Sequence, residues 1–400
     1  MAASEETPAR SGSAFWNDPR FRSIFFQLLV VGLVAGFGWY LFRNTSANLE
    51  RQGIASGFEF WNSTAGFGII MHLIEYSEES TYGRAFWVGL LNTMLMAGIG
   101  VVLATVIGFI VGIARLSSNW LIAKMATVYV ETLRNIPLLL QIFFWYFAVL
   151  RAVPGPRQSH SLFDAFFVNN RGLYSPKPLF GDGFGFIAIG FLAAIAGIVF
   201  VRRWARKRQD ETGEQFPIFL TSLGIFFGLP LLGLIAAVLV YGGVPLSFDY
   251  PALKGFNFKG GLVMIPEFVA LLLALSAYTA SFIAEIVRAG ILAVSHGQTE
   301  AAHSLGLRNG PTLRLVVIPQ ALRVIIPPLT SQYLNLTKNS SLAAAIAYPE
   351  LVSVFAGTVL NQTGQAVEVI GITMTIYLGL SLAISAFMNW YNRKMALVER

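Results

Sequence analysis

The sequence of 400 residues contains no cysteine, and only 12% of its residues are charged. The absence of cysteine excludes disulfide bridges and thiolate metal sites. Ordinary soluble domains carry about 25% charged residues, so a proportion near half of that argues against a soluble domain. A large buried core would seldom need the long uncharged runs that this chain contains.

Three motifs that carry chemistry are also missing from the sequence. The chain has no Gly-x-x-x-x-Gly-Lys-Ser/Thr loop to cradle a phosphate, no His-Glu-x-x-His zinc motif and no Gly-x-Ser-x-Gly turn. We therefore expect no catalytic residue, no ATPase activity of its own, and no cofactor or metal bound by this chain.

Apolar residues are abundant instead: 55% are hydrophobic, and 33 Phe and 38 Gly are present. Uncharged runs of 18 residues or more are long enough to cross a bilayer as helices. The pattern predicts an all-α polytopic membrane protein with about eight spans. The spans are expected at 23–42, 85–114, 121–150, 184–201, 217–241, 262–290, 341–360 and 369–392.

The charge distribution predicts the orientation of these spans. The densest basic cluster is Arg202-Arg203 with Arg206-Lys207-Arg208, and such clusters favour the cytoplasmic side. Alternation of the spans then places both termini in the cytoplasm. The net charge of +7 follows from such loops and needs no nucleic-acid partner. The loop 151–183 is an exception, since it is expected outside and yet carries more cations than acids.

One stretch, from Gly297 to Pro328, is polar and broken by Gly and Pro among apolar surroundings. Residues 300–305 are expected to form a short amphipathic helix, with Ala301 and Leu305 on one face. Gly306 is placed where a helix ends, because Gly tolerates the left-handed conformation of a C-terminal cap. Two surface helices in a loop without any partner would also fit amphipathicity alone.

The residues of this stretch resemble the Glu-Ala-Ala loop of ATP-binding-cassette (ABC) importer permeases, in particular the polar amino-acid family. Other segments resemble the same family, so the likeness covers about 85–155 and 262–392. The matching residues are Leu91-Asn92-Thr93, Glu131 to Gln141, Tyr278-Thr279-Ala280, Glu300-Ala301-Ala302, Gly306, Ile318-Pro319-Gln320, Lys338-Asn339-Ser340 and Glu350-Leu351.

This resemblance implies a type I ABC importer transmembrane domain with a five-helix core. The chain then divides into an N-terminal tail, first span and periplasmic loop, two core parts around a two-span insertion, and a cytoplasmic tail. Their limits are 1–84, 85–155, 156–261, 262–392 (with a cytoplasmic coupling loop at 291–340) and 393–400. The added span and insertion are similar to the larger, Q-type permease subunits of general L-amino-acid importers. Whether the chain is that subunit or its partner permease stays open.

The family also implies partners and a location. They are a second homologous permease, a pair of ABC ATPases that bind ATP and Mg²⁺, a periplasmic amino-acid-binding protein and the lipid of the bacterial inner membrane. Contact with the ATPase is expected from the coupling loop, at Gly297, Gln298, Glu300, Ala301, Ala302, Gly306 and Pro319.

Polar groups at membrane depth are candidates for the substrate path or for helix pairing, because each buried charge needs a partner or water. Glu131 with Arg134, and Glu285 with Arg288, are spaced i,i+3 and could each form a local ion pair. A zwitterionic amino acid needs both cationic and oxygen-bearing groups. The residues expected to line its path are Gln141, Tyr278, Ser281, Asn335, Lys338 and Asn339.

Three other functions stay open at this point. A permease for one narrow substrate, such as glutamate, aspartate or glutamine, would carry the same motifs. An ion-coupled secondary transporter would explain the spans and intramembrane charges but not the Glu-Ala-Ala loop. A membrane scaffold would transport nothing.

Overall fold

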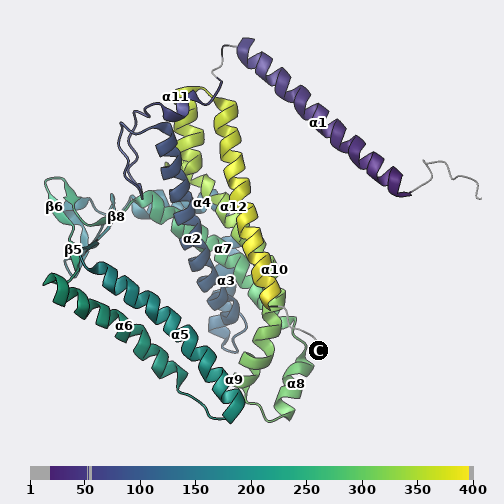
Figure 1. Ribbon diagram of the computed structural model, residues 1–400, viewed down its shortest axis with the longest axis vertical. Helices are drawn as coiled ribbons and strands as arrows, with labels where there is room; N and C mark the ends of the chain where they lie inside the picture. Colours follow the sequence, from purple (N-terminus) through teal and green to yellow (C-terminus); the bar gives the residue numbers. More distant parts are fainter. Residues whose placement is uncertain (1–18, 52, 54–55, 396–400) are drawn as a thin grey trace, which may run out of the picture. The chain divides into compact units, whose positions relative to one another are not determined.

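The structure, a computed structural model, describes residues 19–51, 53 and 56–395 (Figure 1). Within these residues, seven helices are long and apolar enough to cross a membrane. An eighth span results if two helices bent by 107°, Trp120–Asn135 and Leu138–Leu150, count as one. The expectation of a helical polytopic protein with about eight spans is confirmed. Residues 1–18 and 396–400, which belong to the predicted terminal tails, lie outside the described residues.

The long helices are α1 (Pro19–Arg51), α2 (Tyr82–Ala114), α5 (Phe184–Thr212), α6 (Ile218–Tyr241), α7 (Pro266–Leu292), α10 (Ile318–Asn339) and α12 (Ala366–Met395). The shorter ones are α3 (Trp120–Asn135), α4 (Leu138–Phe143), α8 (His296–Ser304), α9 (Asn309–Thr312) and α11 (Leu360–Thr363). π-Helical turns occupy Phe144–Leu150, Leu313–Val317 and Val352–Val359. The described residues form two compact units: those up to 92 together with 349–382, and 93–348 together with those from 383 on.

The first unit is built around an aromatic core. Phe86 of α2 lies with its ring centroid 5.2 Å from that of Phe355, and Phe60 and Val369 are buried in the same cluster. Helix α1 belongs to this unit, yet none of its apolar window is buried within the described chain. Such an unburied apolar surface suits a hydrocarbon environment.

In the second unit, α7 is the central helix, with 56% of its apolar window buried. Ile283 of α7 packs in one cluster with Ala104 of α2 and with Ile325 and Leu329 of α10. Helix α3 also packs on α7, and the Tyr129 hydroxyl donates to the Ala277 carbonyl oxygen at 2.8 Å. Three helices therefore hold α7 in place.

Two glycines set the distance between α2 and α7. A Cβ atom at Gly108 would lie 2.6 Å from Ile283 Cβ, and one at Gly112 would lie 2.7 Å from the Ala284 carbonyl oxygen. No larger residue fits at either position without a shift of one helix. Glycines of this kind let membrane helices pack with their backbones close together.

The seventh span differs from its sequence prediction. The predicted span 341–360 is not one helix, because a break at 347–350 interrupts it, with Ala347 in the left-handed region at φ 58°. The candidate span is Asn309–Ile346, which covers much of the predicted loop 291–340. Pro327 and Pro328 suggested a loop but lie inside α10. Membrane helices tolerate proline where neighbouring groups satisfy the freed carbonyls.

The insertion contains short strands that the sequence analysis did not predict. They are β1 (His160–Leu162), β2 (Phe166–Asn169), β3 (Gly172–Ser175), β4 (Lys177–Phe180), β5 (Leu246–Asp249), β6 (Ala252–Lys254), β7 (Asn257–Lys259) and β8 (Leu262–Met264). All pairs are antiparallel, in a sheet ordered β1-β2-β3-β8 and two two-stranded sheets, β4-β5 and β6-β7.

Helices α5 and α6 lie between β4 and β5 in the sequence, and the two helices run side by side (Figure 1). Strands β4 and β3 precede α5, while their partners β5 and β8 follow α6. The strands therefore gather at one end of the helix pair α5–α6. The basic cluster at Arg202 to Arg208 lies toward the other end of this pair.

The close approach of α2 and α7 gives a test of the fold. Gly108→Leu must push α7 away, and overpacking of this kind costs about 1–3 kcal/mol. We expect thermal unfolding of the detergent-solubilised protein at a lower temperature than for the wild type. Gly98→Leu in the same helix is the matched control, because nothing lies within 4 Å of a Cβ built at Gly98. Equal melting temperatures for the two variants would contradict the packing described here.

Candidate functional site

The polar stretch identified in the sequence forms a surface helix, α8, that directly follows α7. Only Ala293–Ser295 separate the two helices. Glu300 is exposed, and its Oε1 lies 3.7 Å from Nδ1 of His296, one helical turn earlier. Gln298, Gly297 and Ala301 are exposed as well. The face that carries most of the predicted coupling residues is thus open to a partner.

Gly306 ends α8 as the sequence predicts. Its φ of +79° is left-handed. The Leu307 N–H donates to the Ala302 carbonyl at 3.1 Å, and the Gly306 N–H donates to the His303 carbonyl at 2.8 Å. These two bonds form a Schellman motif, which satisfies carbonyls that the end of a helix leaves open.

Helix α8 also contacts the rest of the chain, through Ala302 and through Gln298 at the edge of its exposed face. Ala302 is buried, at 4% exposure. The Gln320 side-chain amide of α10 donates to Gln298 Oε1 at 3.2 Å. Pro319 is half-buried in the first turn of α10. Helix α8 is therefore tied to α10 by contacts and to α7 by the chain itself.

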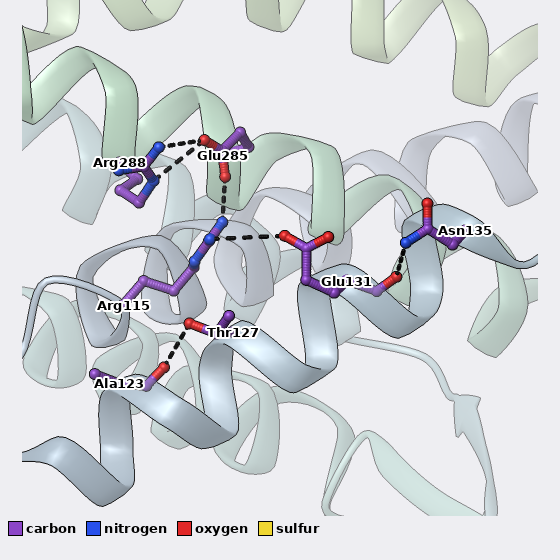
Figure 2. A network of polar contacts seen from close by, with 7 residues as sticks. All are labelled: Arg115, Ala123, Thr127, Glu131, Asn135, Glu285 and Arg288. Atoms are coloured by element: carbon purple, nitrogen blue, oxygen red, sulfur yellow. Dashed lines mark hydrogen bonds and ion pairs between the residues drawn. The ribbon is translucent and has the colours of Figure 1, made fainter.

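A network of charged side chains joins α2, α3 and α7 (Figure 2). Arg115, which follows the last residue of α2, forms an ion pair with Glu285 of α7. A second guanidinium nitrogen of Arg115 lies 3.9 Å from Glu131 of α3. Glu285 also pairs with Arg288, whose Nη2 lies 2.6 Å from Glu285 Oε1. The Arg115 side chain is only 11% exposed and that of Glu285 27%, so their ion pair is partly shielded from water, whereas Glu131 is 58% exposed.

The two predicted i,i+3 pairs have different outcomes. Glu285 and Arg288 form the local ion pair. Glu131 instead faces Arg115, while Arg134 lies with its guanidinium carbon 5.1 Å from the centre of the Phe282 ring. Arg115 was not predicted as the common partner, since a contact between residues 170 positions apart leaves no local signal in the sequence.

Gln141 has a structural role in this chain. Its side-chain amide donates to the carbonyl oxygens of Leu133 and Ile136, both at 2.9 Å. These bonds brace the bend between α3 and α4. Gln141 Oε1 has no hydrogen-bond partner among the described residues.

The other predicted path residues fall into two groups. Tyr278 and Ser281 lie in α7, where Ser281 is fully buried and its hydroxyl donates to the Tyr278 carbonyl at 2.6 Å. Asn335 and Lys338 are exposed on α10, and Asn339 is half-buried. In the described part of the chain, Lys338 has no acidic side chain within ion-pair distance.

A buried carboxyl group, Glu350, lies in the first unit, in the stretch of sequence that precedes α12. Its two oxygens accept the N–H groups of Val352 and Ser353 at 2.8 and 2.7 Å, and Tyr377 donates its hydroxyl at 3.0 Å. Burial raises the pKa of Glu350 to about 7. The carboxyl thus caps the π-helical turn that follows it.

Asn92 connects this region to α2. Its amide donates to the carbonyl oxygens of Met71 and Pro349, both at 2.8 Å. The structure therefore brings together two segments that resemble the permease family in sequence, Asn92-Thr93 and Glu350-Leu351. No group of three or more metal-binding side chains occurs in residues 19–51, 53 and 56–395.

Comparisons with known proteins agree with these features. Residues 216–397 match the family described as "binding-protein-dependent transport system inner membrane component". The amino-acid ABC transporter permease protein YhdX of Escherichia coli is 57% identical, over 97% of this chain and 98% of YhdX. The general L-amino acid transport system permease protein AapQ of Rhizobium johnstonii is 55% identical, over 96% of this chain and 94% of AapQ.

A third relative is BztB of Rhodobacter capsulatus, a glutamate/glutamine/aspartate/asparagine transport system permease protein. It is 45% identical over 96% of both chains. The chain belongs to the amino-acid ABC transporter permeases.

As a multi-pass ABC transporter permease, the chain is a membrane subunit of a larger transporter. Its α8 and α10 lie inside the family match at 216–397. The α2–α3 part of the charge network lies outside that match, but the full-length relatives cover it.

The charge network of this permease predicts that substitutions of two different arginines change the free energy of unfolding by different amounts. Arg115→Gln leaves the shielded Glu285 with Arg288 as its one ion-pair partner in the described chain, so we expect a loss of about 1–3 kcal/mol. Arg208→Gln is the control, since Arg208 and Glu214 are exposed and such pairs contribute about 1 kcal/mol or less. Chemical unfolding in detergent measures both. An equal loss in the two variants would contradict the role assigned to Arg115.

The buried Glu350 carboxyl predicts that the stability of the folded protein depends on pH. Its folded pKa of about 7 lies above the ordinary value of 4.5, so the folded protein retains a proton that the unfolded chain has released. Stability is therefore greatest at low pH and falls as pH rises between these values, by at most about 1.4 kcal/mol per pH unit. Glu350→Gln removes this component. Melting curves from pH 5 to pH 8 test it, and a wild-type minus variant difference that does not change with pH would refute the assignment.

Proposed function

We propose that this permease forms half of the translocation path of an ATP-driven importer for L-amino acids of broad specificity. The observation that carries the proposal is the full-length similarity to AapQ, the permease of a general L-amino acid transport system. That alignment covers 96% of this chain, whereas the glutamine permease protein GlnM of Bacillus subtilis covers 53%. The long alignments include the insertion, which supports the larger, Q-type subunit.

ATP and Mg²⁺ would bind to two partner ATPase subunits and not to this chain. The missing phosphate-binding motif supports this division of labour. Helix α8 offers the contact, with Glu300 exposed for a cationic partner and the small residues Gly297 and Ala301 beside it. Displacement of α8 would then act on α7 through Ala293–Ser295 and on α10 through Gln320.

A second permease would complete the substrate path. Ser331, Asn335 and Lys338 are exposed along α10, at spacings of four and three residues that place them on one face. A charged side chain facing lipid costs about 2.5–3.5 kcal/mol on insertion scales. A water-filled path between two permeases gives this polar stripe a favourable environment, with Tyr278, Ser281, Gln141 and Asn339 as further candidates.

The proposed site of action is the bacterial inner membrane, with both termini in the cytoplasm. The basic cluster at the end of α5, Arg202 to Arg208, supports this orientation. A periplasmic binding protein would deliver the amino acid to the opposite side, where the strands of the insertion lie.

A narrower substrate range is the second candidate, because BztB is named for acidic amino acids and their amides. Reconstitution in proteoliposomes with a second permease, an ATPase and a binding protein separates the two. Uptake of neutral, basic and acidic L-amino acids supports broad specificity. Uptake confined to glutamate, aspartate and their amides overturns it, and uptake without the ATPase would indicate a secondary transporter.

The coupling role of α8 has its own test. Glu300→Lys reverses the exposed charge, and Gly306→Asp strains a residue at φ +79°. We expect each variant to reach the membrane, yet to lose more than nine-tenths of its uptake while ATP hydrolysis continues, that is, a loss of about ten-fold or more.

Glu211→Lys provides the matched control, since Glu211 is exposed near the end of α5. Its uptake should equal that of the wild type. Wild-type uptake in Glu300→Lys or Gly306→Asp would refute the coupling assignment.

A further inference from the structure

The strand-bearing part of the insertion carries an unexplained excess of positive charge. Residues 151–183 and 242–265 contain six Arg or Lys residues, three Asp residues and no Glu. In the proposed orientation these residues lie on the extracytoplasmic side of the membrane. Arg and Lys are disfavoured in short loops on that side. Cations retained against that bias suggest an interaction that needs them.

Two of the arginines line a single cleft. The cleft has a volume of about 340 Å³ and is lined by residues 155–158, Arg171 and Phe256. The guanidinium carbon of Arg157 lies 4.6 Å from the centre of the Phe256 ring. In the described chain, neither Arg157 nor Arg171 has an acidic side chain within ion-pair distance. Their positive charges are thus available to an external carboxylate.

Hydrogen bonds fix the walls of this cleft before any ligand arrives. Asn169 is buried, its amide donates to the Ser159 hydroxyl at 3.0 Å, and its Oδ1 accepts the N–H of Arg171 at 2.9 Å. The Ser159 hydroxyl donates to the Pro156 carbonyl at 2.7 Å. Asn169 therefore links the backbone segments that carry both arginines. Binding sites held in this way lose little entropy when a ligand binds.

Exposed aromatic side chains accompany the arginines. Phe256, at the β6–β7 turn, is 75% exposed, and Phe163, at the β1–β2 turn, is 86% exposed. Arginine and aromatic residues are the types that dominate the energy of protein–protein interfaces. A free amino acid, in contrast, requires a site that encloses most of its surface. Both arginines are exposed, so the cleft fits a protein surface better than a small molecule.

We propose that this cleft is a docking site for an acidic surface of the extracytoplasmic amino-acid-binding protein. Arg157 and Arg171 bind carboxylate side chains of that protein, and Phe256 packs beside them. Guanidinium groups suit this task because they can donate two parallel hydrogen bonds to one carboxylate. The inference rests on the proposed function, since it requires that a binding protein delivers the substrate.

The experiment uses the whole transporter in proteoliposomes, with its binding protein added at increasing concentration and saturated with a transported L-amino acid. The concentration of binding protein that half-stimulates ATP hydrolysis is measured. For Arg157→Glu/Arg171→Glu we expect this concentration to rise about ten-fold or more. Hydrolysis without binding protein should be unchanged.

Lys177→Glu/Lys254→Glu is the matched control. It makes the same change of charge on strands of the same insertion, outside the lining of the cleft. We expect a rise of about two- to three-fold from the weaker long-range attraction. For Arg157→Gln/Arg171→Gln, the half-stimulating concentration should lie between those of the two charge-reversed variants. This neutral variant still tests the cleft if charge reversal prevents folding.

The outcomes separate the docking site from the proposed function. If the binding protein stimulates the wild type and all three variants with the same half-maximal concentration, docking at this cleft is overturned and the importer function stands. Equal rises in the two charge-reversed variants also overturn the cleft. If the binding protein never stimulates the wild type, the proposed function and the docking site both fail. Binding of free L-glutamate that depends on Arg157 and Arg171 would make the cleft a small-molecule site instead.

Discussion

The close contact between α2 and α7 is the constraint on which the second unit depends. Gly108 and Gly112 allow the two backbones to approach, and Arg115, which directly follows α2 in the chain, pairs with Glu285. The same arginine reaches Glu131, so the position of α3 depends on this approach as well. A wider separation would break the ion pair and remove the shielding that strengthens it. Packing and electrostatics therefore reinforce each other at one helix crossing.

Charged side chains near the membrane serve two different purposes in this chain. Arg115, Glu285 and Arg288 satisfy one another and tie helices together. Lys338 and Asn335 are left exposed on α10. A satisfied network is costly to rearrange, whereas an exposed polar stripe demands water or a partner. This contrast assigns a structural role to the first group and makes the second group the better candidate for contact with substrate.

Local patterns predicted much of this structure, and long-range contacts account for what they missed. Hydropathy located most spans, and the left-handed preference of glycine predicted the end of α8 at Gly306. The position of the seventh span was missed because Pro327 and Pro328 are helix breakers in water but lie inside α10. Arg115 and the Asn92–Pro349 contact depend on residues far apart in sequence. The strands, each of three or four residues, are too short to give a periodic signal.

The pairing of β3 with β8 has a consequence for how such permeases diversify. Leu173 lies opposite Met264, so the chain enters and leaves most of the insertion at adjacent points, directly before α7. A segment closed in this way adds or removes two membrane helices without changing the distance that the remaining chain must bridge. Subunit size can therefore vary in evolution as a single genetic step. The remaining helices of the permease then need no compensating change.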